Sequence, residues 1–324
     1  MNRTRSIVIT SALAVGSLAL AACGSSSTST DGASGSVRVD GSSTVAPLTS
    51  AAAEKFKTES PNINVTVATS GTGGGFEKFC RGETDMNDAS RPIKDEEAAI
   101  CKQNGIEFQE LVIANDALSV VVNKENTWAK CLTTAQLKKI WEPKSTVNNW
   151  NQVDPSFPNE PIKLYGPGTD SGTFDYFTDE INGEEGASRT DFSPSEDDNQ
   201  IVQGVSSSKG GMGYFGFTYY EENADKLNLV QVNSGNGCVT PSAASVQDGT
   251  YTPLGRGLFI YPSAKSLGSN TAFQSFLQYY VNNDAEIAEA AQFIPLSPTQ
   301  QTTLQNEYAA VLKMANVSAS PAAS

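Results

Sequence analysis

The stretch Gly166-Pro-Gly-Thr-Asp-Ser-Gly-Thr173, which runs into Phe174-Asp-Tyr-Phe177, is the feature from which the rest of the chain is best interpreted. The apolar run Ile162–Tyr165 before it predicts a strand, and apolar residues at helical spacing up to Ile181 predict a helix after it. A Gly-rich turn that opens a helix presents unpaired backbone N–H groups at the positive end of the helix dipole. Hydroxyl side chains add donors, so the turn is typical of an oxyanion site. One such turn is weak support, because many strand-to-helix turns are rich in Gly and Ser for packing reasons alone.

Similar turns follow two predicted strands near the N-terminus. Ser36–Asp40 predicts a strand that leads through Gly41-Ser-Ser-Thr44 into a helix with Pro47 in its first turn. The alternating residues Ile63, Val65 and Val67 predict the next strand, which ends in Thr69-Ser-Gly-Thr-Gly-Gly-Gly75 before a helix expected from Phe76. The glycines of this second turn allow a ligand to approach the backbone closely.

A further turn carries a cation. Asp85–Ala89 leads into Ser90-Arg-Pro-Ile93, and a helix is expected from about Asp95 to Gln103. A guanidinium group matches the geometry of a tetrahedral oxyanion, although a surface role for Arg91 is equally compatible with the sequence.

Composition excludes several classes of site. The chain of 324 residues has a formal net charge of −14 and contains no histidine. The negative charge disfavours nucleic acid and anionic membrane surfaces as partners, although a buried anion site depends on its local donors. The lack of histidine removes Ser-His-Asp and Cys-His catalysis and the commonest metal ligand.

The first residues predict export. Met1–Cys23 combines Arg3 and Arg5, an apolar stretch and Leu20-Ala-Ala-Cys23, which resembles the bacterial lipobox. The resemblance implies a signal peptide over residues 1–22 and a lipid on Cys23, and an ordinary signal peptide cut nearby is the alternative. Residues 23–36 then form the lipidated cysteine and a flexible tether.

The four remaining cysteines, Cys80, Cys101, Cys131 and Cys238, predict two disulfides with three possible pairings. We favour Cys80–Cys101 and Cys131–Cys238, because the first closes a local loop and the second stays within one lobe. A zinc site is the less favoured alternative, since no Cys-x-x-Cys pair exists.

The rest of the chain alternates strands and helices. Ala117–Val122 predicts a buried strand, and Thr133 or Thr134 caps the next helix. Further segments continue the α/β pattern: a loop over Val147–Glu160, a helix after Asp191–Asn199, strands at Gly210–Phe217 and Thr252–Pro262, two helices near the C-terminus, and a disordered tail from Ala315.

With these turns quoted, the chain resembles the phosphate-binding lipoproteins of the bacterial phosphate ABC importer, the PstS family. The resemblance lies in four motifs in order, at Gly41–Val45, Ser70–Phe76, Ala89–Ile93 and Gly166–Phe174, and it extends from Val37 to the last helices.

The resemblance implies an α/β fold of the periplasmic-binding-protein type (type II-like), with two lobes joined by two crossover segments. Lobe I is expected at residues 37–122 plus 251–312, lobe II at 123–250, and a disordered tail at 313–324. By motif position, the resemblance implies that phosphate is bound by a set of residues from both lobes: Ser43, Thr44, Thr72, Ser90, Arg91, Ser171, Gly172 and Thr173.

The chain departs from the best-studied members at Ser90 and Pro167, where those carry Asp and Arg. A carboxylate accepts the proton of hydrogen phosphate and repels sulfate, so its replacement by Ser90 leaves this selectivity open. Asp170 is our candidate substitute acceptor, with a helix N-cap as its alternative role. Arg91 is our candidate for the missing arginine.

Enzymatic alternatives lack necessary residues. Thr169-Asp-Ser-Gly172 is similar to a serine nucleophile motif, but without histidine only a Ser-Lys dyad remains, and this loop has no lysine. The Gly-Lys-Ser/Thr of a nucleotide-binding P-loop is absent from the sequence.

We therefore interpret the chain as a non-enzymatic, cofactor-free receptor that closes on inorganic phosphate and delivers it to a membrane ABC permease. It is expected to be a monomer that is lipid-anchored on the extracytoplasmic face of the cell membrane and that does not bind nucleic acid. A broader, sulfate-type oxyanion receptor and a surface adhesin on the same fold are the alternatives.

Overall fold

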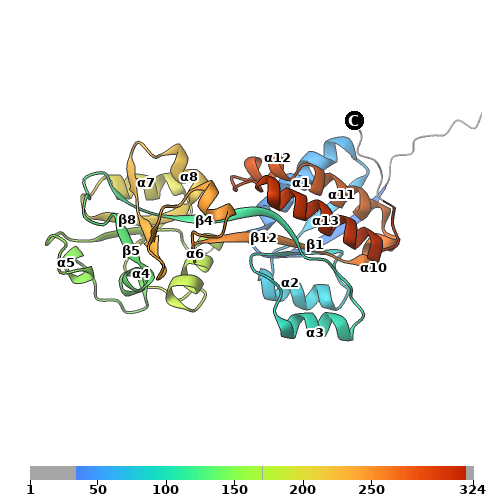
Figure 1. The fold of residues 1–324 in the computed structure, drawn as a ribbon, viewed down its shortest axis with the longest axis horizontal. Helices are drawn as coiled ribbons and strands as arrows, with labels where there is room; N and C mark the ends of the chain where they lie inside the picture. Colours follow the sequence, from blue (N-terminus) through green and yellow to red (C-terminus); the bar gives the residue numbers. More distant parts are fainter. Residues whose placement is uncertain (1–33, 170, 319–324) are drawn as a thin grey trace, which may run out of the picture. The chain divides into compact units, whose positions relative to one another are not determined.

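A mixed sheet runs through both lobes of the described part of the chain and carries helices on both faces (Figure 1). The computed structural model describes residues 34–169 and 171–318, and these belong to one compact unit. Its nine-stranded sheet has the order β2-β1-β3-β12-β4-β8-β6-β7, with β9 also paired to β4. The pairs β1–β2, β1–β3, β6–β8 and β6–β7 are parallel, whereas β12 and β4 run antiparallel to each other and to their outer neighbours.

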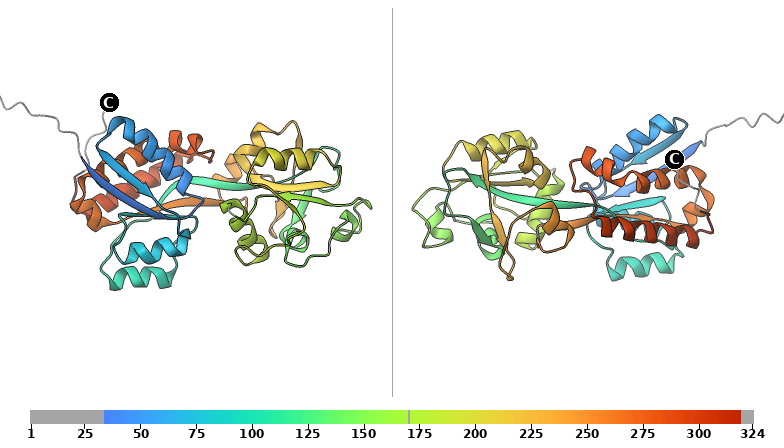
Figure 2. Two further views of the ribbon diagram at one scale, coloured as in Figure 1. Left: turned by 180° about the vertical axis from the view of Figure 1, so that it is seen from behind. Right: turned by 45° about the horizontal axis from the view of Figure 1, so that its top comes forward.

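The first group of elements forms lobe I. Its strands and helices are β1 (Gly35–Gly41), α1 (Ala46–Glu59), β2 (Ile63–Val67), α2 (Gly71–Cys80), β3 (Met86–Ala89), α3 (Asp95–Gln103), and, near the C-terminus, α10 (Ala264–Ser269), α11 (Thr271–Asn282), α12 (Asp284–Ala290) and α13 (Pro298–Met314). Helices α1, α11 and α13 cover one face of the sheet, and α2 and α3 cover the other (Figures 1 and 2).

The second group forms lobe II. It comprises β5 (Cys131–Thr133), α4 (Thr134–Trp141), α5 (Trp150–Val153), β6 (Lys163–Gly166), α6 (Gly172–Phe177), the π-helical turn η1 (Thr178–Asn182), β7 (Ser193–Pro194), α7 (Asp198–Ser206), β8 (Gly211–Gly216), α8 (Phe217–Glu222), β9 (Leu227–Leu229), β10 (Gln231–Asn233), β11 (Cys238–Val239) and α9 (Ala243–Gln247). A small sheet of order β11-β10-β5 lies beside the main one.

Two long strands belong to both lobes. Strand β4 (Leu111–Asn123) contributes Leu111, Ile113 and Ala114 to the lobe I core and its second half to the lobe II core. Strand β12 (Gly255–Pro262) pairs with β4 over Gly255–Ile260 and enters the lobe I core at Leu258. These strands are the two crossovers of a two-lobed periplasmic-binding-protein fold, as the sequence predicted.

The packing boundaries differ from the predicted ones. Residues Ala117–Val122, which were expected in lobe I, pack in lobe II because β4 is longer than the predicted strand. Tyr251 and Leu254, also expected in lobe I, lie in the lobe II core, where the Tyr251 hydroxyl donates to the Leu118 carbonyl at 2.8 Å. Helix α13 continues to Met314, which contradicts the predicted tail start at residue 313 but not the one at Ala315.

Helix α2 begins earlier than the sequence predicted. It starts at Gly71 rather than Phe76, so the glycine run forms the first turns of the helix instead of a loop before it. The reason is the closeness of α2 to the sheet: a Cβ at Gly75 would overlap the Asn87 side chain and the Gly41 backbone. The glycines therefore allow α2 to pack directly on β1 and β3.

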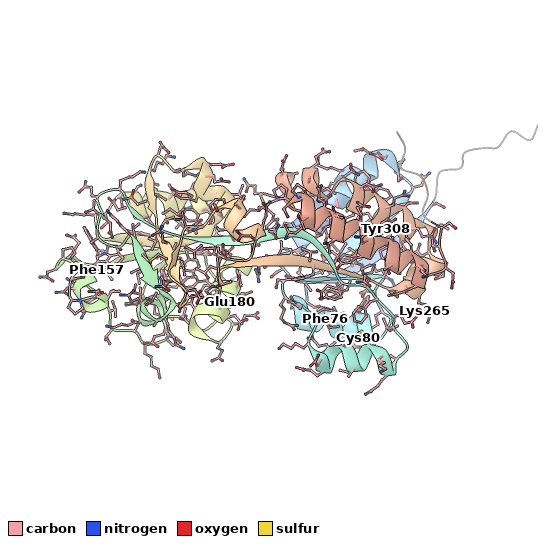
Figure 3. All side chains as sticks on the ribbon, in the orientation of Figure 1. Phe76, Cys80, Phe157, Glu180, Lys265 and Tyr308 are labelled. Atoms are coloured by element: carbon pink, nitrogen blue, oxygen red, sulfur yellow. A yellow bond between two sulfur atoms is a disulfide. The ribbon has the colours of Figure 1, made fainter. Side chains whose placement is uncertain are left out.

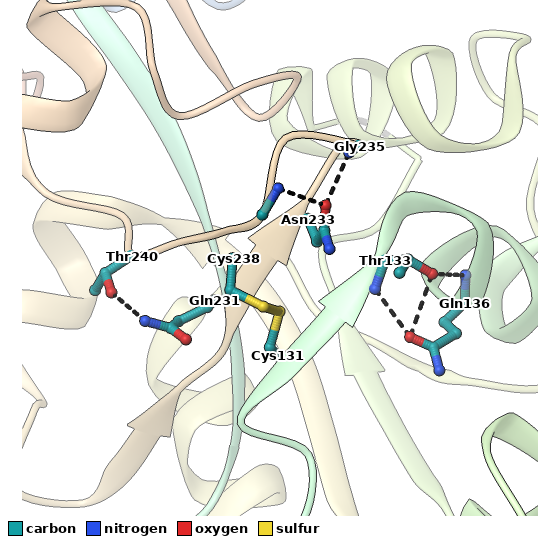
Figure 4. Close-up of a disulfide and its surroundings, with 9 residues drawn as sticks. Cys131, Thr133, Gln136, Gln231, Asn233, Gly235, Cys238 and Thr240 are labelled. Carbon is teal, nitrogen blue, oxygen red and sulfur yellow. Dashed lines mark hydrogen bonds between the residues drawn. A yellow bond between two sulfur atoms is a disulfide. The ribbon is translucent and has the colours of Figure 1, made fainter.

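Both favoured disulfides are present. Cys80–Cys101 joins α2 to α3 in lobe I, and Cys131–Cys238 joins β5 to β11 in lobe II. Beside the second bond, Thr133 and Gln136 cap α4 reciprocally, and Asn233 accepts from the backbone of Gly235 and Gly237 (Figure 4). Each lobe therefore has one covalent link between its elements.

Candidate oxyanion site

The carboxyl ends of the parallel strands of lobe I place the predicted turns at one edge of the sheet. Ser42–Thr44 follow β1, Ser70 follows β2 and precedes α2, and Ser90 follows β3. Since β1 lies between β2 and β3, these turns are neighbours in space. The carboxyl ends of strands in α/β sheets are the usual place for a ligand.

These turns line a cavity of about 480 Å³ that also receives residues of lobe II and of β12. The lining residues are Ser42, Ser43, Thr44, Ser70, Gly71, Thr72, Gly73, Gly74, Ser90, Arg91, Lys94, Gly172, Asp175, Tyr176, Asp179, Glu180, Glu185 and Arg256. Most of the lobe I members are hydroxyl or glycine residues, so the cavity offers many neutral hydrogen-bond donors.

A larger cavity of about 970 Å³ lies elsewhere in lobe I, among α1, α11, α12 and α13. Its described lining includes the carboxylates of Glu59 and Asp284 and no lysine or arginine. The smaller cavity is therefore the better candidate for an anion.

The hydroxyl groups of the lobe I turns are in mutual contact. The Thr72 and Ser90 hydroxyl oxygens lie 3.1 Å apart, and the Ser90 backbone N–H donates to the Thr72 hydroxyl at 3.2 Å. The structure thus brings together two residues that the sequence assigned to different motifs.

Asp40, at the end of β1, holds the turn before α2 in place. Its carboxylate accepts from the Ser70 backbone N–H at 2.9 Å and the Ser70 hydroxyl at 2.7 Å, and it pairs with Lys78. Burial by itself would raise the pKa of Asp40, but the hydrogen bonds from Lys78 and Ser70 outweigh it and lower the pKa. Asp40 therefore stays charged and engaged outside the described lining of the cavity.

Arg256 is the cation at the centre of the site, and the sequence motifs did not point to it. Its guanidinium donates to the Asp116 carboxylate at 3.2 Å, to the Ser90 carbonyl at 3.3 Å and to the Thr44 hydroxyl at 3.3 Å. It also stacks on Tyr176, 3.4 Å from the ring centroid, and only 14% of its side chain is exposed. A charged residue between two glycines in an otherwise apolar strand was the clue available in the sequence.

Arg91 lines the cavity, but its guanidinium is engaged by another group. Both of its terminal nitrogens donate to the Glu97 carboxylate, at 2.9 and 2.8 Å. Glu97 also accepts from the Lys94 backbone N–H at the start of α3. The Arg91 fork is thus used within lobe I, which makes Arg256 the better candidate for the missing arginine.

On the lobe II side, the quoted stretch approaches lobe I at Gly172. A Cβ at this position would lie 2.5 Å from the Thr44 hydroxyl, so only glycine permits the approach. The Ser171 hydroxyl caps α6 by accepting from the Thr173 N–H at 3.2 Å, and neither residue is in the described lining. Asp170, the predicted proton acceptor, lies outside the described residues.

Lobe II also contributes four carboxylates to the lining: Asp175, Asp179, Glu180 and Glu185. Glu180, on η1, is labelled in Figure 3 together with Phe76 on the lobe I helix α2. Burial raises the pKa of Asp175, the charge of Glu185 raises it further, and Arg256 opposes the rise. The cavity therefore combines donors from lobe I with acidic groups from lobe II.

Comparison with known proteins shows the family of the chain. The PBP superfamily domain matches residues 26–284. The phosphate-binding protein PstS of Staphylococcus saprophyticus is 41% identical over 293 residues, which are 90% of each chain. The chain belongs to the PstS family of solute-binding proteins. The members of this family are binding proteins of ABC transporters and not enzymes.

Three further proteins are similar to this chain. The protein SphX of Synechococcus elongatus is 48% identical over 275 residues, covering 84% of this chain and 81% of SphX. The crystal structure of a possible phosphate-binding protein from Planctomyces limnophilus has a TM-score of 0.83 at 44% identity, covering 87% of this chain and all of that one. An ABC-type phosphate transport receptor from Vibrio cholerae shares the fold, with a TM-score of 0.65 at 21% identity.

Proposed function

We propose that this protein is the extracytoplasmic receptor of a phosphate ABC importer, which binds inorganic phosphate between its lobes and delivers it to the permease. The observation that carries the proposal is the convergence of Thr44, Thr72, Ser90 and Arg256 on one cavity. The membership of the PstS family supports phosphate as the ligand.

In this proposal, affinity comes from hydrogen bonds rather than from net positive charge. Neutral hydroxyl and backbone donors of Ser43, Thr44, Thr72 and Ser90 surround the anion, and Arg256 supplies a charge-assisted fork. Arg256 is held in place by Asp116 and by the Tyr176 ring, so its side chain loses little conformational freedom when the anion binds.

We propose that phosphate binding closes the two lobes on each other. Thr44 belongs to lobe I, whereas Ser171–Thr173 begin α6 of lobe II. A ligand that contacts both turns binds the closed state more tightly than the open one and shifts the population towards it. The permease then recognises the closed state.

A titration experiment tests the proposal. The purified protein, stripped of anion, is titrated with phosphate and separately with sulfate by calorimetry. Tight one-to-one binding of phosphate alone is expected. Equal binding of both anions would indicate the broader oxyanion receptor, and binding of neither would favour the adhesin.

Lipid anchoring is the second part of the proposal. The lipobox-like Leu20-Ala-Ala-Cys23 and the Ser/Gly-rich segment after it support an anchor on Cys23, with the binding domain held outside the membrane. Residues 1–33 lie outside the described structure. Among the residues that it does describe, no helix has the length and apolar character needed to span a bilayer.

The anchor is tested by replacing Cys23 with Ser in the full-length chain and following membrane fractionation and incorporation of labelled fatty acid. Loss of both, with the wild-type chain labelled and membrane-bound, is the expected result. Persistent labelling of Cys23→Ser would contradict it.

A further inference from the structure

Four carboxylates in the lining of a predicted anion site need an explanation. The described lining contains three cations, Arg91, Lys94 and Arg256, against Asp175, Asp179, Glu180 and Glu185. Arg91 is already paired with Glu97 and Arg256 with Asp116. The cavity therefore does not attract an anion by its net charge, and its carboxylates repel any oxyanion that cannot offer them a proton.

Asp175 differs from the other three in position and burial. It lies in the first turn of α6, and its backbone N–H donates to the Ser171 carbonyl at 3.1 Å. It is half-buried, whereas Asp179, Glu180 and Glu185 are exposed. Among the described residues, no hydrogen bond or ion pair engages its side chain.

The surroundings of Asp175 favour an interaction with an O–H group. Arg256 and Glu185 are the charges that act on it most, with opposite signs. Burial and Glu185 together raise the pKa of the Asp175 carboxyl, which strengthens it as a hydrogen-bond acceptor while it is ionised. Asp175 lines the same cavity as the Arg256 guanidinium, which would bind the anion.

Taking phosphate binding as proposed above, we infer that Asp175 is the residue that selects protonated oxyanions, by accepting a hydrogen bond from the P–OH group. Hydrogen phosphate and arsenate satisfy this acceptor. Sulfate has no proton at neutral pH and would place an oxygen lone pair against the carboxylate. The discrimination between phosphate and sulfate then comes from a carboxylate of lobe II, and not from the lobe I position that Ser90 occupies.

The inference is tested with Asp175→Asn, whose amide can donate to sulfate. The dissociation constants for phosphate and sulfate are measured by calorimetry for the wild type and the variant. The sulfate-to-phosphate ratio, which is the dissociation constant for sulfate divided by that for phosphate, is expected to fall at least about tenfold in Asp175→Asn. The reason is that the variant lacks the carboxylate that repels sulfate. An unchanged ratio would overturn the inference.

Three matched variants make the result specific. Glu221→Gln removes an exposed carboxylate of lobe II that lies outside the described lining of the cavity, and it should leave the ratio unchanged. Asp175→Glu keeps the carboxylate and should keep a high ratio even if Asp175→Asn folds poorly. Asp170→Asn tests the sequence-based candidate, and a fall in the ratio there but not in Asp175→Asn would transfer the role to Asp170.

The outcomes separate this inference from the proposed function. Failure of the wild type to bind phosphate would reject the receptor itself. Phosphate binding with a ratio that does not respond to Asp175 would reject only the role of Asp175.

Discussion

On the lobe I side of the cavity, the neighbouring carboxylates are engaged or neutral, whereas on the lobe II side they line the cavity itself. Asp40 is bound by Ser70 and Lys78, and Glu97 is bound by Arg91. Asp88 is fully buried, and burial raises its pKa to about 8, with the charge of Asp40 adding to the rise. Asp175 and its acidic neighbours instead face the space where an anion would bind.

This difference indicates that the two lobes contribute different groups to the binding of an anion. Lobe I and β12 provide donors and the guanidinium, which favour any oxyanion of suitable size. Lobe II provides acceptors, which penalise oxyanions without a proton. Affinity and selectivity can therefore be changed separately, and three of the following predictions concern affinity for the anion, while one concerns the buried carboxyl of lobe I.

The largest effect is expected for Arg256→Ala. Loss of the buried guanidinium removes its charge-assisted bonds and leaves Asp116 unpaired beside the anion. Phosphate affinity is expected to fall by roughly 100-fold or more in calorimetric titration. Arg256→Lys, which keeps the charge and loses the fork, should be intermediate. A change of less than about threefold in Arg256→Ala would contradict the central role of this residue.

Asp88→Asn should change how stability depends on pH. Because burial raises the pKa of Asp88 to about 8 in the folded state, whereas the unfolded chain releases the proton near the ordinary aspartate pKa of 3.8, the wild type loses stability as pH rises between these values. The amide of the variant does not titrate. The free energy of unfolding of Asp88→Asn should therefore rise relative to that of the wild type by about 1.4 kcal/mol for each unit that the pH increases. Urea unfolding at pH 5, 6 and 7 measures this difference. If the free energy of unfolding changed with pH equally in the two proteins, Asp88 would be ionised in the folded state.

Thr44→Val tests a single neutral donor of lobe I. The substitution keeps the shape of the side chain and removes the hydroxyl that contacts Arg256. Phosphate affinity is expected to fall by about tenfold, with the sulfate-to-phosphate ratio little changed. Thr66→Val, on the exposed side of β2, is the matched control. A large change of the ratio in Thr44→Val would mean that lobe I also takes part in selection.

The smallest effect is expected for Arg91→Ala. Since both terminal nitrogens of Arg91 already bind Glu97, phosphate affinity should change by less than about threefold in the same titration. A loss comparable to that of Arg256→Ala would instead restore Arg91 as the principal cation of the site.

Much of the architecture could be predicted because it depends on local sequence. Ser42–Thr44 and Ser90–Ile93 lie in turns after strands, as expected, and Thr133 caps α4. The start of α2 was wrong because it depends on contacts of Gly75 with Asn87 and Gly41, which no local pattern records.

The identity of the cation in the site shows the same limit. Arg91 lies within a motif and is therefore the cation that the sequence indicates, whereas its ion pair with Glu97 is visible only in the structure. Arg256 reaches Thr44 from 212 residues away in the sequence, so only the pairing of β12 with β3 and β4 brings it to the cavity.

The sequence by itself determined the turns, the alternation of strands and helices, and membership of a family, because hydrogen-bonding and steric preferences act over a few residues. The tertiary structure decided which charges meet. It placed Arg256 among the hydroxyl groups, engaged Arg91 with Glu97 and placed Asp175 in the lining of the same cavity. Charge pairing depends on distance in space, and strand order fixes that distance only once the chain has folded.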